Sequence, residues 1–572
     1  MPRICQVPKR LRRRAFISAL LLLSTLTLMP VVLLAQGATP GEQRAVRAFE
    51  AAKSDKANAL ALEAFLAKMP KGGDLHMHLS GAVYAETFLK DAAADNLCVN
   101  PNPKSLSFVK NVGLTNAGIA KDSPAGPVCP EGDVPAASVF QNQKLYDALV
   151  DAFSMRGFVP SAGVSGHDQF FATFDRFGGL DKSHAGEWLD EVATRAAGQN
   201  EQYLEVMQTP SFFDLAPLWN SLGWPPLRGV LDASRDKDSA DGSAPGFEGD
   251  ATGTSRAELS ALREKLLAGG LRKEAALDAK EMDDALAARN RIEHCGEANA
   301  AAACSVKIRY LYQVLRAFPP QQVFAQTLLA FEVASADAND VGLNFVQPED
   351  ATLAMSEYNR QMHMLDYLHG VYPKVHISLH AGELAPGLVP PAGLKFHIRE
   401  AVELGHAERI GHGVDVMYET NPRALLKEMA ARHVMVEINL TSNDVILGVV
   451  PPHHPLPEYR AAHVPVALAT DDEGVSRIDL THEFVRAAME YGLGYLDLKA
   501  MARASLEHSF LPGESLWAKP DDFTRVKAAC AGQAAGTELP SAKCQALLKS
   551  SERAAEQWEL ERRFAAFEAS LP

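Results

Sequence analysis

A pair of histidines, His76 and His78, stands in the apolar run DLHMHL at residues 74–79. Residues two apart on a β-strand project to the same face, so both imidazoles could bind one metal ion. An H-x-H pair alone is more often incidental than a metal site. The pair therefore needs support from the rest of the chain.

Two further motifs supply that support. In SLHAGE (378–383), His380 ends an apolar run and would complete a three-histidine face, while Glu383 would act as a general acid/base beside the metal. The alternative is a surface turn in which Glu383 caps a helix. In RIGHGVD (409–415), His412 stands between two glycines, which allow close backbone approach and unusual dihedral angles. A histidine held there can orient a nucleophilic water, and an ordinary tight turn is the alternative.

Adjacent carboxylates follow the strand-like run in ALATDDEG (467–474), where Asp471 could bind a metal and Asp472 could face a substrate. Three imidazoles and one carboxylate suit Zn²⁺ with a bound water. Such a metal lowers the pKa of its water and favours hydrolytic attack on an electrophilic carbon. The sequence lacks H-E-x-x-H, G-x-S-x-G and P-C-x-x-C, the signatures of other hydrolases and of the small zinc deaminases.

These residues require elements that bring them together. Short apolar runs alternate with amphipathic segments, a pattern typical of a parallel sheet. About eight such units between residues 72 and 510 predict a (β/α)₈ TIM-type barrel with helical and loop insertions. A doubly wound sheet is the alternative, although no G-x-G-x-x-G turn is found. The candidate residues follow the carboxyl ends of these runs, where a barrel carries its active site. The predicted strands are 74–79, 202–208, 340–346, 375–381, 409–414, 434–441 and 464–471.

The chain divides into four predicted regions. The amino-terminal region is basic, then apolar over residues 15–35, and then rich in small residues, which is typical of a cleaved export signal. An uncleaved anchor is the alternative and the only case in which we expect membrane contact. We therefore expect a periplasmic or secreted protein. The regions are a signal peptide (1–36), a helical lead-in (37–70), a metal-dependent barrel (71–515) with insertions near 92–140 and 232–258, and a C-terminal helical extension (516–572).

Six cysteines remain after the predicted signal, and they favour disulfides in an oxidising compartment. Six cysteines allow 15 pairings. We prefer the scheme that joins neighbours in the sequence. That scheme pairs Cys98 with Cys129, Cys295 with Cys304, and Cys530 with Cys544.

Composition limits the class of partner. The 572 residues are 47% hydrophobic, enough for a sizeable core, and carry a net charge of −15. Binding to nucleic acid requires a basic surface, so we expect no nucleic-acid partner. A nucleoside, which has no phosphate, is not excluded. A homodimer is compatible with the sequence, which does not specify the oligomeric state.

H-x-H, LHAGE, RIGHG, TSN and ATDD occur in that order, and the set resembles the adenosine deaminase family of the amidohydrolase superfamily. ASLEHSFLP (504–512) resembles the segment that follows the barrel in this family. The resemblance covers about residues 70–515. The predicted signal and the long insertion after the first strand resemble the secreted, growth-factor-related branch.

The resemblance implies a role for each matching residue and one zinc ion per chain. Glu383 would protonate the purine N1, His412 would orient and deprotonate the water, and Asp472 would bond the purine N7. Hydroxide would add to C6 and ammonia would leave, converting adenosine and 2′-deoxyadenosine to inosine and deoxyinosine. The implied zinc ligands are His76, His78, His380 and Asp471.

Two positions depart from the family pattern. Ser80 stands where the family often has Asp or Asn contacting the sugar. Gln347, in FVQPED (345–350), aligns with a glycine whose backbone N–H contacts the base. Both are retained as candidate substrate-binding residues. They also support an alternative, a related amidohydrolase acting on another aminopurine or N-substituted adenine nucleoside. A binding protein on an inactive scaffold is a third hypothesis, which the presence of Glu383 opposes.

Glu205 and the segment PPHHP are expected to have structural roles. Glu205, in a predicted strand, is expected to make a hydrogen bond behind the metal site. The segment PPHHP (451–455), with His453 and His454, is expected to be a solvent loop, with a place at the mouth of the barrel as the alternative.

Overall fold

The computed structural model describes residues 38–58, 60–102, 107–109, 129–180, 182–211, 215–224 and 254–572. The predicted signal peptide at 1–36 lies outside the described residues. So does most of the predicted insertion at 232–258, of which residues 254–258 are described. Within the described residues, none of the helices combines the length and apolar character needed to cross a membrane.

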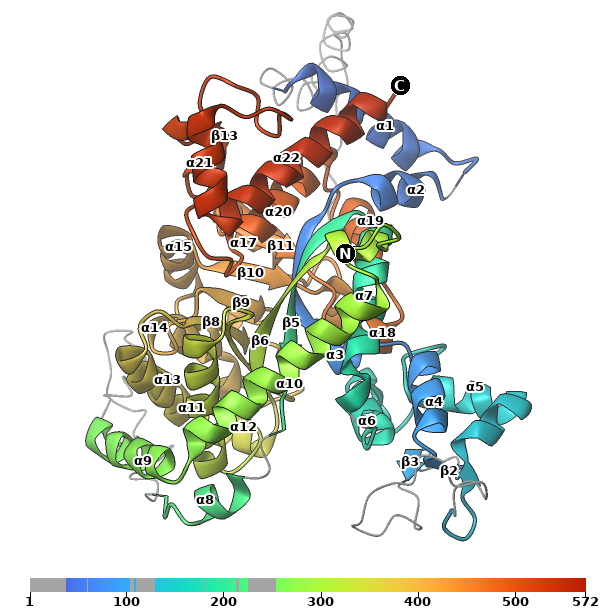
Figure 1. Ribbon diagram of the computed structural model, residues 1–572, viewed down its shortest axis with the longest axis vertical. Coiled ribbons are helices and arrows are strands. Elements are labelled where there is room, and N and C mark those ends of the chain that lie inside the picture. The colour runs from blue at the N-terminus through green and yellow to red at the C-terminus, as the bar shows by residue number, and fades with distance from the viewer. Residues whose placement is uncertain are drawn as a thin grey trace, which may run out of the picture.

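Eight parallel strands form the centre of the molecule (Figure 1). Each strand pairs with the next one in the sheet order. Asp471, just beyond the last strand, donates its N–H to His76 O at 2.8 Å and so joins the last strand to the first. The predicted TIM-type barrel is confirmed. The strands are β1 (Gly72–His78), β5 (Glu201–Gln208), β6 (Lys307–Leu315), β7 (Asp340–Val346), β8 (His376–Ala381), β9 (Arg409–His412), β10 (Met435–Ile438) and β11 (Val466–Leu468).

The predicted strands missed β6. This strand begins KIRYLYQ, and the side chains of Lys307, Arg309 and Gln313 are only half-buried. Lys307 and Arg309 both pair with Glu552 of the C-terminal helix α22 (Glu552–Ser570). A strand covered by a charged helix shows charged residues where a parallel strand normally has a continuous apolar run.

Helices cover the outside of the barrel (Figure 1). The helix α11 (Pro320–Ala336) is buried on nearly every side. It packs on β6 and β7 and also lies under α10 (Leu271–Ile292) and α13 (Tyr358–Val371). The main covering helices are α7 (Ala185–Gly198), α10 (Leu271–Ile292), α11 (Pro320–Ala336), α13 (Tyr358–Val371), α14 (His397–Glu403), α15 (Pro422–Arg432), α16 (Leu440–Leu447), α17 (Leu456–Ala461), α19 (Leu480–Glu490) and α20 (Tyr495–Glu507).

The two ends of the described chain meet at the amino-terminal end of the barrel. Lys499 on α20 binds both Glu42 of α1 (Pro40–Ser54) at 2.9 Å and Glu568 of α22 at 2.6 Å. Ser505, also on α20, accepts the N–H of Gly73 at the start of β1. The helices α1, α2 (Ala61–Lys68), α20 and α22 therefore brace the end of the barrel opposite to the predicted site.

A small lobe follows β1. It contains α4 (Ala85–Ala94), α5 (Gln143–Ala152), α6 (Gly166–Phe177) and a short antiparallel sheet of β2 (Cys98–Asn100), β3 (Ser107–Val109) and β4 (Val134–Pro135). A disulfide between Cys98 and Cys129 ties this sheet to the segment before β4. The other predicted pairs, Cys295–Cys304 and Cys530–Cys544, are also disulfides, so the neighbour scheme is confirmed.

Candidate active site

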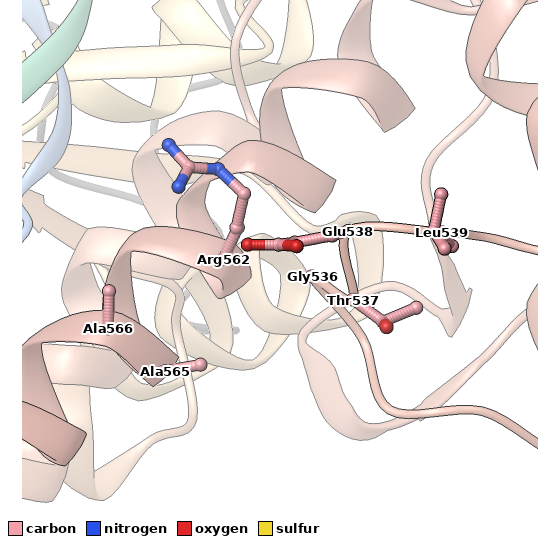
Figure 2. Close-up of a pocket in the computed structure, with 7 residues that line it drawn as sticks. All are labelled: Gly536, Thr537, Glu538, Leu539, Arg562, Ala565 and Ala566. Atoms are coloured by element: carbon pink, nitrogen blue, oxygen red, sulfur yellow. The ribbon is translucent and has the colours of Figure 1, made fainter.

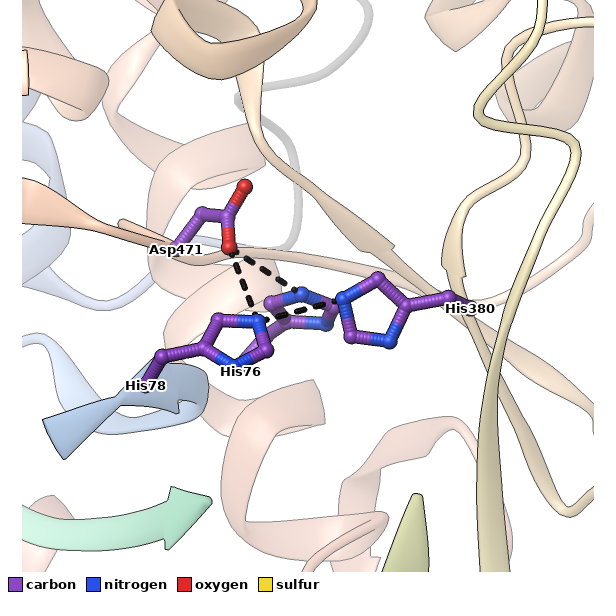
Figure 3. Close-up of side chains that lie close together, drawn as sticks. All are labelled: His76, His78, His380 and Asp471. Carbon is purple, nitrogen blue, oxygen red and sulfur yellow. Dashed lines mark hydrogen bonds and ion pairs between the residues drawn. The ribbon is translucent and has the colours of Figure 1, made fainter. Parts of the chain in front are cut away.

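Four predicted ligands converge at the carboxyl ends of three strands (Figure 3). His76 and His78 come from β1, His380 from β8, and Asp471 follows β11. Their candidate ligand atoms lie within 4.8 Å of one another. His78 Nε2 lies 3.2 Å from both His380 Nε2 and Asp471 Oδ1, and His76 Nε2 lies 3.5 Å from Asp471 Oδ1. The barrel thus brings together residues separated by almost 400 positions.

This cluster fits a divalent metal ion. His76 Nε2 and Asp471 Oδ1 are buried and have no hydrogen-bond partner among the described residues. Burying such groups unpaired is costly, which favours an unseen partner. Ligand atoms bound to one Zn²⁺ at about 2.0–2.1 Å lie at most about 4 Å apart, and the separations of 3.2–3.5 Å fall within that reach.

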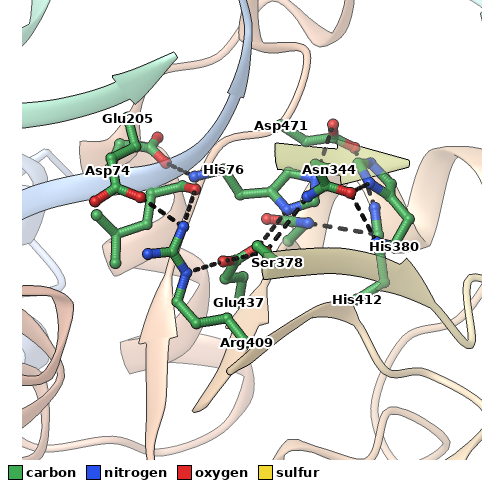
Figure 4. A network of polar contacts seen from close by, with 12 residues as sticks. Asp74, His76, Glu205, Asn344, Ser378, His380, Arg409, His412, Glu437 and Asp471 are labelled. Carbon is green, nitrogen blue, oxygen red and sulfur yellow. Dashed lines mark hydrogen bonds and ion pairs between the residues drawn. The ribbon is translucent and has the colours of Figure 1, made fainter. Parts of the chain in front are cut away.

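Each candidate metal ligand is held by a hydrogen bond with another side chain, as Figure 4 shows for His76 and His380. The Nδ1 of each ligand histidine has an oxygen partner on another strand of the barrel, which directs Nε2 toward the centre. Ser442 donates to Asp471 Oδ2 at 2.6 Å and leaves Oδ1 facing the imidazoles. The Nδ1 partners are Glu437 for His76 (2.6 Å), Gln313 for His78 (2.8 Å) and Asn344 for His380 (2.8 Å).

A buried ion network supports His76. Arg409 donates to Glu437 Oε1 and to Glu205 Oε2, both at 2.6 Å. Burial raises the pKa of Glu437, but Arg409 and His76 outweigh it and lower that pKa to about 2. Glu205 also accepts from the Phe510 N–H. The predicted structural role of Glu205 is confirmed, although it acts through Arg409 and does not touch a ligand directly.

Glu383 lies beside the cluster and is positioned by Glu349. The Glu349 carboxylate accepts the backbone N–H groups of Gly382 at 3.1 Å and Glu383 at 2.7 Å. It also accepts from His397 Nδ1. Burial, together with the charges of Asp471 and Glu349, raises the pKa of Glu383 well above its usual value. A raised pKa favours the protonated form, which suits Glu383 to act as an acid.

His412 ends β9 with a φ of 69°, in the left-handed region, so its flanking glycines fit a sharp change of direction. Its Nε2 lies 3.7 Å from Glu383 Oε1 and 3.8 Å from Asp471 Oδ2. Burial lowers the pKa of His412 to about 3, so the ring is neutral. The structure therefore places His412 between the acid and the candidate metal ligands.

The expected solvent loop at 451–455 is only half right. His453 is exposed, but His454 is buried and is 2% exposed. His454 Nε2 lies 3.0 Å from Asn443 Oδ1, and Asn443 Nδ2 lies 2.9 Å from His412 Nδ1. The sequence does not predict this link, since only the fold brings the loop against α16. The sequence feature that could have indicated this link is the closeness of the TSN motif (441–443) to the histidine-rich loop (451–455).

Asp472 lies against the first turn after β1. Burial and the neighbouring Asp471 raise the pKa of Asp472 to about 8, although His78 opposes the shift. Its Oδ1 has no hydrogen-bond partner among the described residues. Ser80 is half-buried on α3 (Leu79–Ala82), next to Gly81, which contacts the Asp472 carboxylate. The two candidate substrate contacts therefore lie close together.

Gln347, the other candidate substrate-binding residue, has a backbone conformation typical of glycine. Its φ is 85°, a conformation that favours glycine, in keeping with the glycine predicted to align there. Its side chain turns away and accepts the Ala317 N–H at 2.9 Å through Oε1. Its carbonyl lies 3.4 Å from Arg316 Nε. The side chain is thus engaged by the loop after β6, and the metal cluster does not include it.

A separate hollow of about 500 Å³ lies in the C-terminal extension (Figure 2). It is lined by residues 536–539 and by Arg562, Ala565 and Ala566 of α22. Its lining contains no histidine or cysteine, and none of the predicted site residues contributes to it. The candidate chemistry therefore belongs to the strand ends.

Known proteins resemble this chain in sequence and in fold. The family model described as adenosine deaminase matches residues 288–518, a range that contains five of the predicted site residues close to the cluster but not the pair on β1. An adenosine deaminase of Escherichia coli (strain SE11) is 36% identical over 140 residues, which are 24% of this chain and 39% of the relative. The matched stretch thus spans well under half of that relative.

Two solved structures are also similar. The N6-methyl-AMP deaminase of Arabidopsis thaliana has a TM-score of 0.47 and 19% identity, over 79% of this chain and 94% of the other. The adenine deaminase of Arthrobacter aurescens has a TM-score of 0.46 and 14% identity, over 77% and 94%. Over residues 288–518 the chain is therefore similar to adenosine deaminases in sequence.

Proposed function

We propose that this protein is an exported, zinc-dependent hydrolytic deaminase that converts adenosine and 2′-deoxyadenosine to the corresponding inosines and ammonia. The observation that carries the proposal is one buried cluster in which four candidate metal ligands adjoin Glu383, His412 and Asp472. When bound, a zinc ion supplies a Lewis acid and lowers the pKa of a coordinated water.

The surrounding side chains have the properties that deamination requires. Glu383, with its raised pKa, holds a proton that it can give to the purine N1, which makes C6 more electrophilic. His412 orients the water that attacks C6. The purine N7 is a hydrogen-bond acceptor and needs a donor. Asp472, with its raised pKa, can supply one in its protonated form.

A second candidate is a related activity on another aminopurine or on an N-substituted adenine nucleoside. Ser80 favours it, because a short neutral hydroxyl replaces the longer polar group that the family pattern predicts near the sugar. A similar fold occurs in a protein named N6-methyl-AMP deaminase, so substituted adenines belong in any substrate test.

A substrate panel separates these candidates. Purified protein of measured zinc content is incubated with adenosine, 2′-deoxyadenosine, adenine and N6-methyladenosine, and released ammonia or methylamine is quantified. We expect adenosine and 2′-deoxyadenosine to be the best substrates. Turnover of a zinc-loaded sample on adenine or N6-methyladenosine alone would favour the second candidate. No amine released from any of them would overturn both.

Export is a separate part of the proposal. It is supported by the predicted signal at 1–36 and by the three disulfides, which persist in oxidising compartments. Amino-terminal sequencing of the protein from the periplasm or medium should find a mature chain beginning near residues 36–39. An intact amino terminus on protein recovered only from the cytoplasm would contradict export.

A further inference from the structure

A directed chain of hydrogen bonds reaches His412 from the backbone at the start of α17. The Leu456 N–H donates to His454 Nδ1 at 3.1 Å. A neutral imidazole that accepts at Nδ1 carries its proton on Nε2. His454 Nε2–H therefore donates to Asn443 Oδ1 at 3.0 Å. The Asn443 amide is then left to donate from Nδ2 to His412 Nδ1 at 2.9 Å.

The direction of this chain of hydrogen bonds does not depend on which side-chain atom of Asn443 is assigned as oxygen and which as nitrogen. The oxygen and nitrogen of an asparagine amide have almost the same shape, so their partners decide its orientation. Here the first donor is a backbone N–H, which cannot accept. Every later bond follows from it. Asn439 Nδ2 also faces His412 Nδ1, at 3.4 Å, and reinforces the same direction.

His454 is held firmly enough to impose this order. It is buried, and its ring packs edge-on against Tyr491 with centroids 5.6 Å apart. Burial and the nearby Arg486 lower the pKa of His454 to about 3, in keeping with a neutral ring that keeps Nδ1 free to accept. Both ring nitrogens of His454 are engaged, and the hydrogen bonds run in a line that ends at His412.

We propose that His454 is a positioning residue which, through Asn443, fixes His412 as the tautomer that carries its proton on Nε2. In that tautomer His412 Nε2–H points toward Glu383 and Asp471, 3.7 and 3.8 Å away, and is able to donate a hydrogen bond to a water held between them. His412 then holds the attacking water by donating to its oxygen. This differs from the role implied by the family resemblance, in which His412 also takes the proton of the water. Here the carboxylate of Asp471, whose Oδ2 lies 3.8 Å from His412 Nε2, is the group that would accept that proton. The part that concerns turnover rests on the proposed deaminase function.

The tautomer can be measured without any substrate. Zinc-loaded protein labelled with ¹⁵N-histidine is examined by NMR, and the His412 ring signals are assigned by their loss in His412→Gln. We expect an unprotonated Nδ1 and a protonated Nε2. In Asn443→Asp, the carboxylate still accepts from His454 but can only accept from His412, so the proton should move to Nδ1. A wild-type proton on Nδ1, or no change in Asn443→Asp, would overturn the inference.

Kinetics then distinguish positioning from packing. His454→Phe keeps a ring but removes both nitrogens, and we expect kcat to fall about 10-fold to 100-fold with little change in KM, as for other groups behind an active site. His454→Gln can still donate to Asn443 and should recover most of kcat. His453→Gln, at the exposed neighbour, is the matched control and should behave as wild type. We expect the kcat of Asn443→Asp to fall further than that of His454→Phe. The loss should approach the roughly 10⁴-fold by which a wrong histidine tautomer lowers the kcat of a serine protease.

The outcomes separate the two proposals. If no aminopurine is turned over but the NMR signals behave as expected, the deaminase proposal fails and the tautomer assignment stands. If deamination is intact and the folded His454→Phe and Asn443→Asp variants leave both kcat and the ring signals unchanged, the positioning role fails. A His454→Phe variant that lowers only the melting temperature would likewise show that His454 serves packing alone.

Discussion

Gly81 and Asp472 are in such close contact that no side chain can be added at residue 81 without moving the carboxylate. A Cβ built on Gly81 would lie 1.4 Å from Asp472 Oδ1 and 2.3 Å from its Cγ. Gly81 has no unusual backbone angle that would demand glycine, so the requirement comes from space alone. The turn after β1 therefore fixes where Asp472 can point.

Gly81→Ala should displace Asp472 while leaving the metal ligands in place. If Asp472 bonds the base, losing that bond should cost about 1–3 kcal/mol, or about 5-fold to 150-fold in kcat/KM. Zinc content should stay unchanged. Gly198→Ala is the matched control, because a Cβ at that exposed helix position meets no atom within 4 Å and should not affect activity. Equal kcat/KM in the two variants would argue against a substrate contact from Asp472.

Glu349 should make the protein sensitive to acid. Burial raises its pKa, but His397 and Arg316 outweigh this and lower it to about 2. A carboxylate with a lowered folded pKa stabilises the protein fully above its unfolded value, near 4.5, and loses that contribution as pH falls toward about 2. A shift of this size corresponds to about 3 kcal/mol.

Glu349→Gln removes this charge and should lower the melting temperature at neutral pH, because His397 and Arg316 lose their buried partner. Thermal unfolding measured from pH 7 downward should show a shallower acid-induced loss in the variant than in wild type. Parallel curves for the two proteins would show that Glu349 does not contribute the expected stability.

Gln313 should control metal affinity from outside the ligand set. His78 Nδ1 donates to its Oε1 at 2.8 Å. Gln313→Met keeps the length of the side chain but removes this acceptor, so we expect zinc affinity to fall about 10-fold to 100-fold. Gln313→Glu keeps an acceptor and should hold zinc at least as well as wild type. Competition with a chelator measures both; equal affinity in all three proteins would contradict the role.

Much of the site followed from residue order alone. Metal ligands and acids at the ends of apolar runs are local signals, and the barrel rule places such ends together. His76, His78, His380 and Asp471 therefore came together as expected. The strand β6 was missed because Lys307 and Arg309 face helix α22, which a local pattern of hydrophobicity does not reveal.

The parts that escaped prediction depend on tertiary contact. The burial of His454 comes from the packing of a loop against α16 and Tyr491, and nothing in PPHHP itself distinguishes His454 from the exposed His453. The turned-away side chain of Gln347 likewise depends on the free N–H of Ala317 in another loop. Neither contact is encoded by spacing along the chain.

The central claim is that water, activated in this cluster, replaces the amino group at C6 with Glu383 as the acid. The most direct test is adenosine turnover in water enriched in oxygen-18, comparing wild type with Glu383→Gln at equal zinc content. The account predicts inosine carrying a single labelled oxygen, released with an equal amount of ammonia. It also predicts a loss of about 10²-fold to 10⁴-fold in kcat for the variant, which should keep its zinc. Unlabelled product, or full activity in Glu383→Gln, would contradict it.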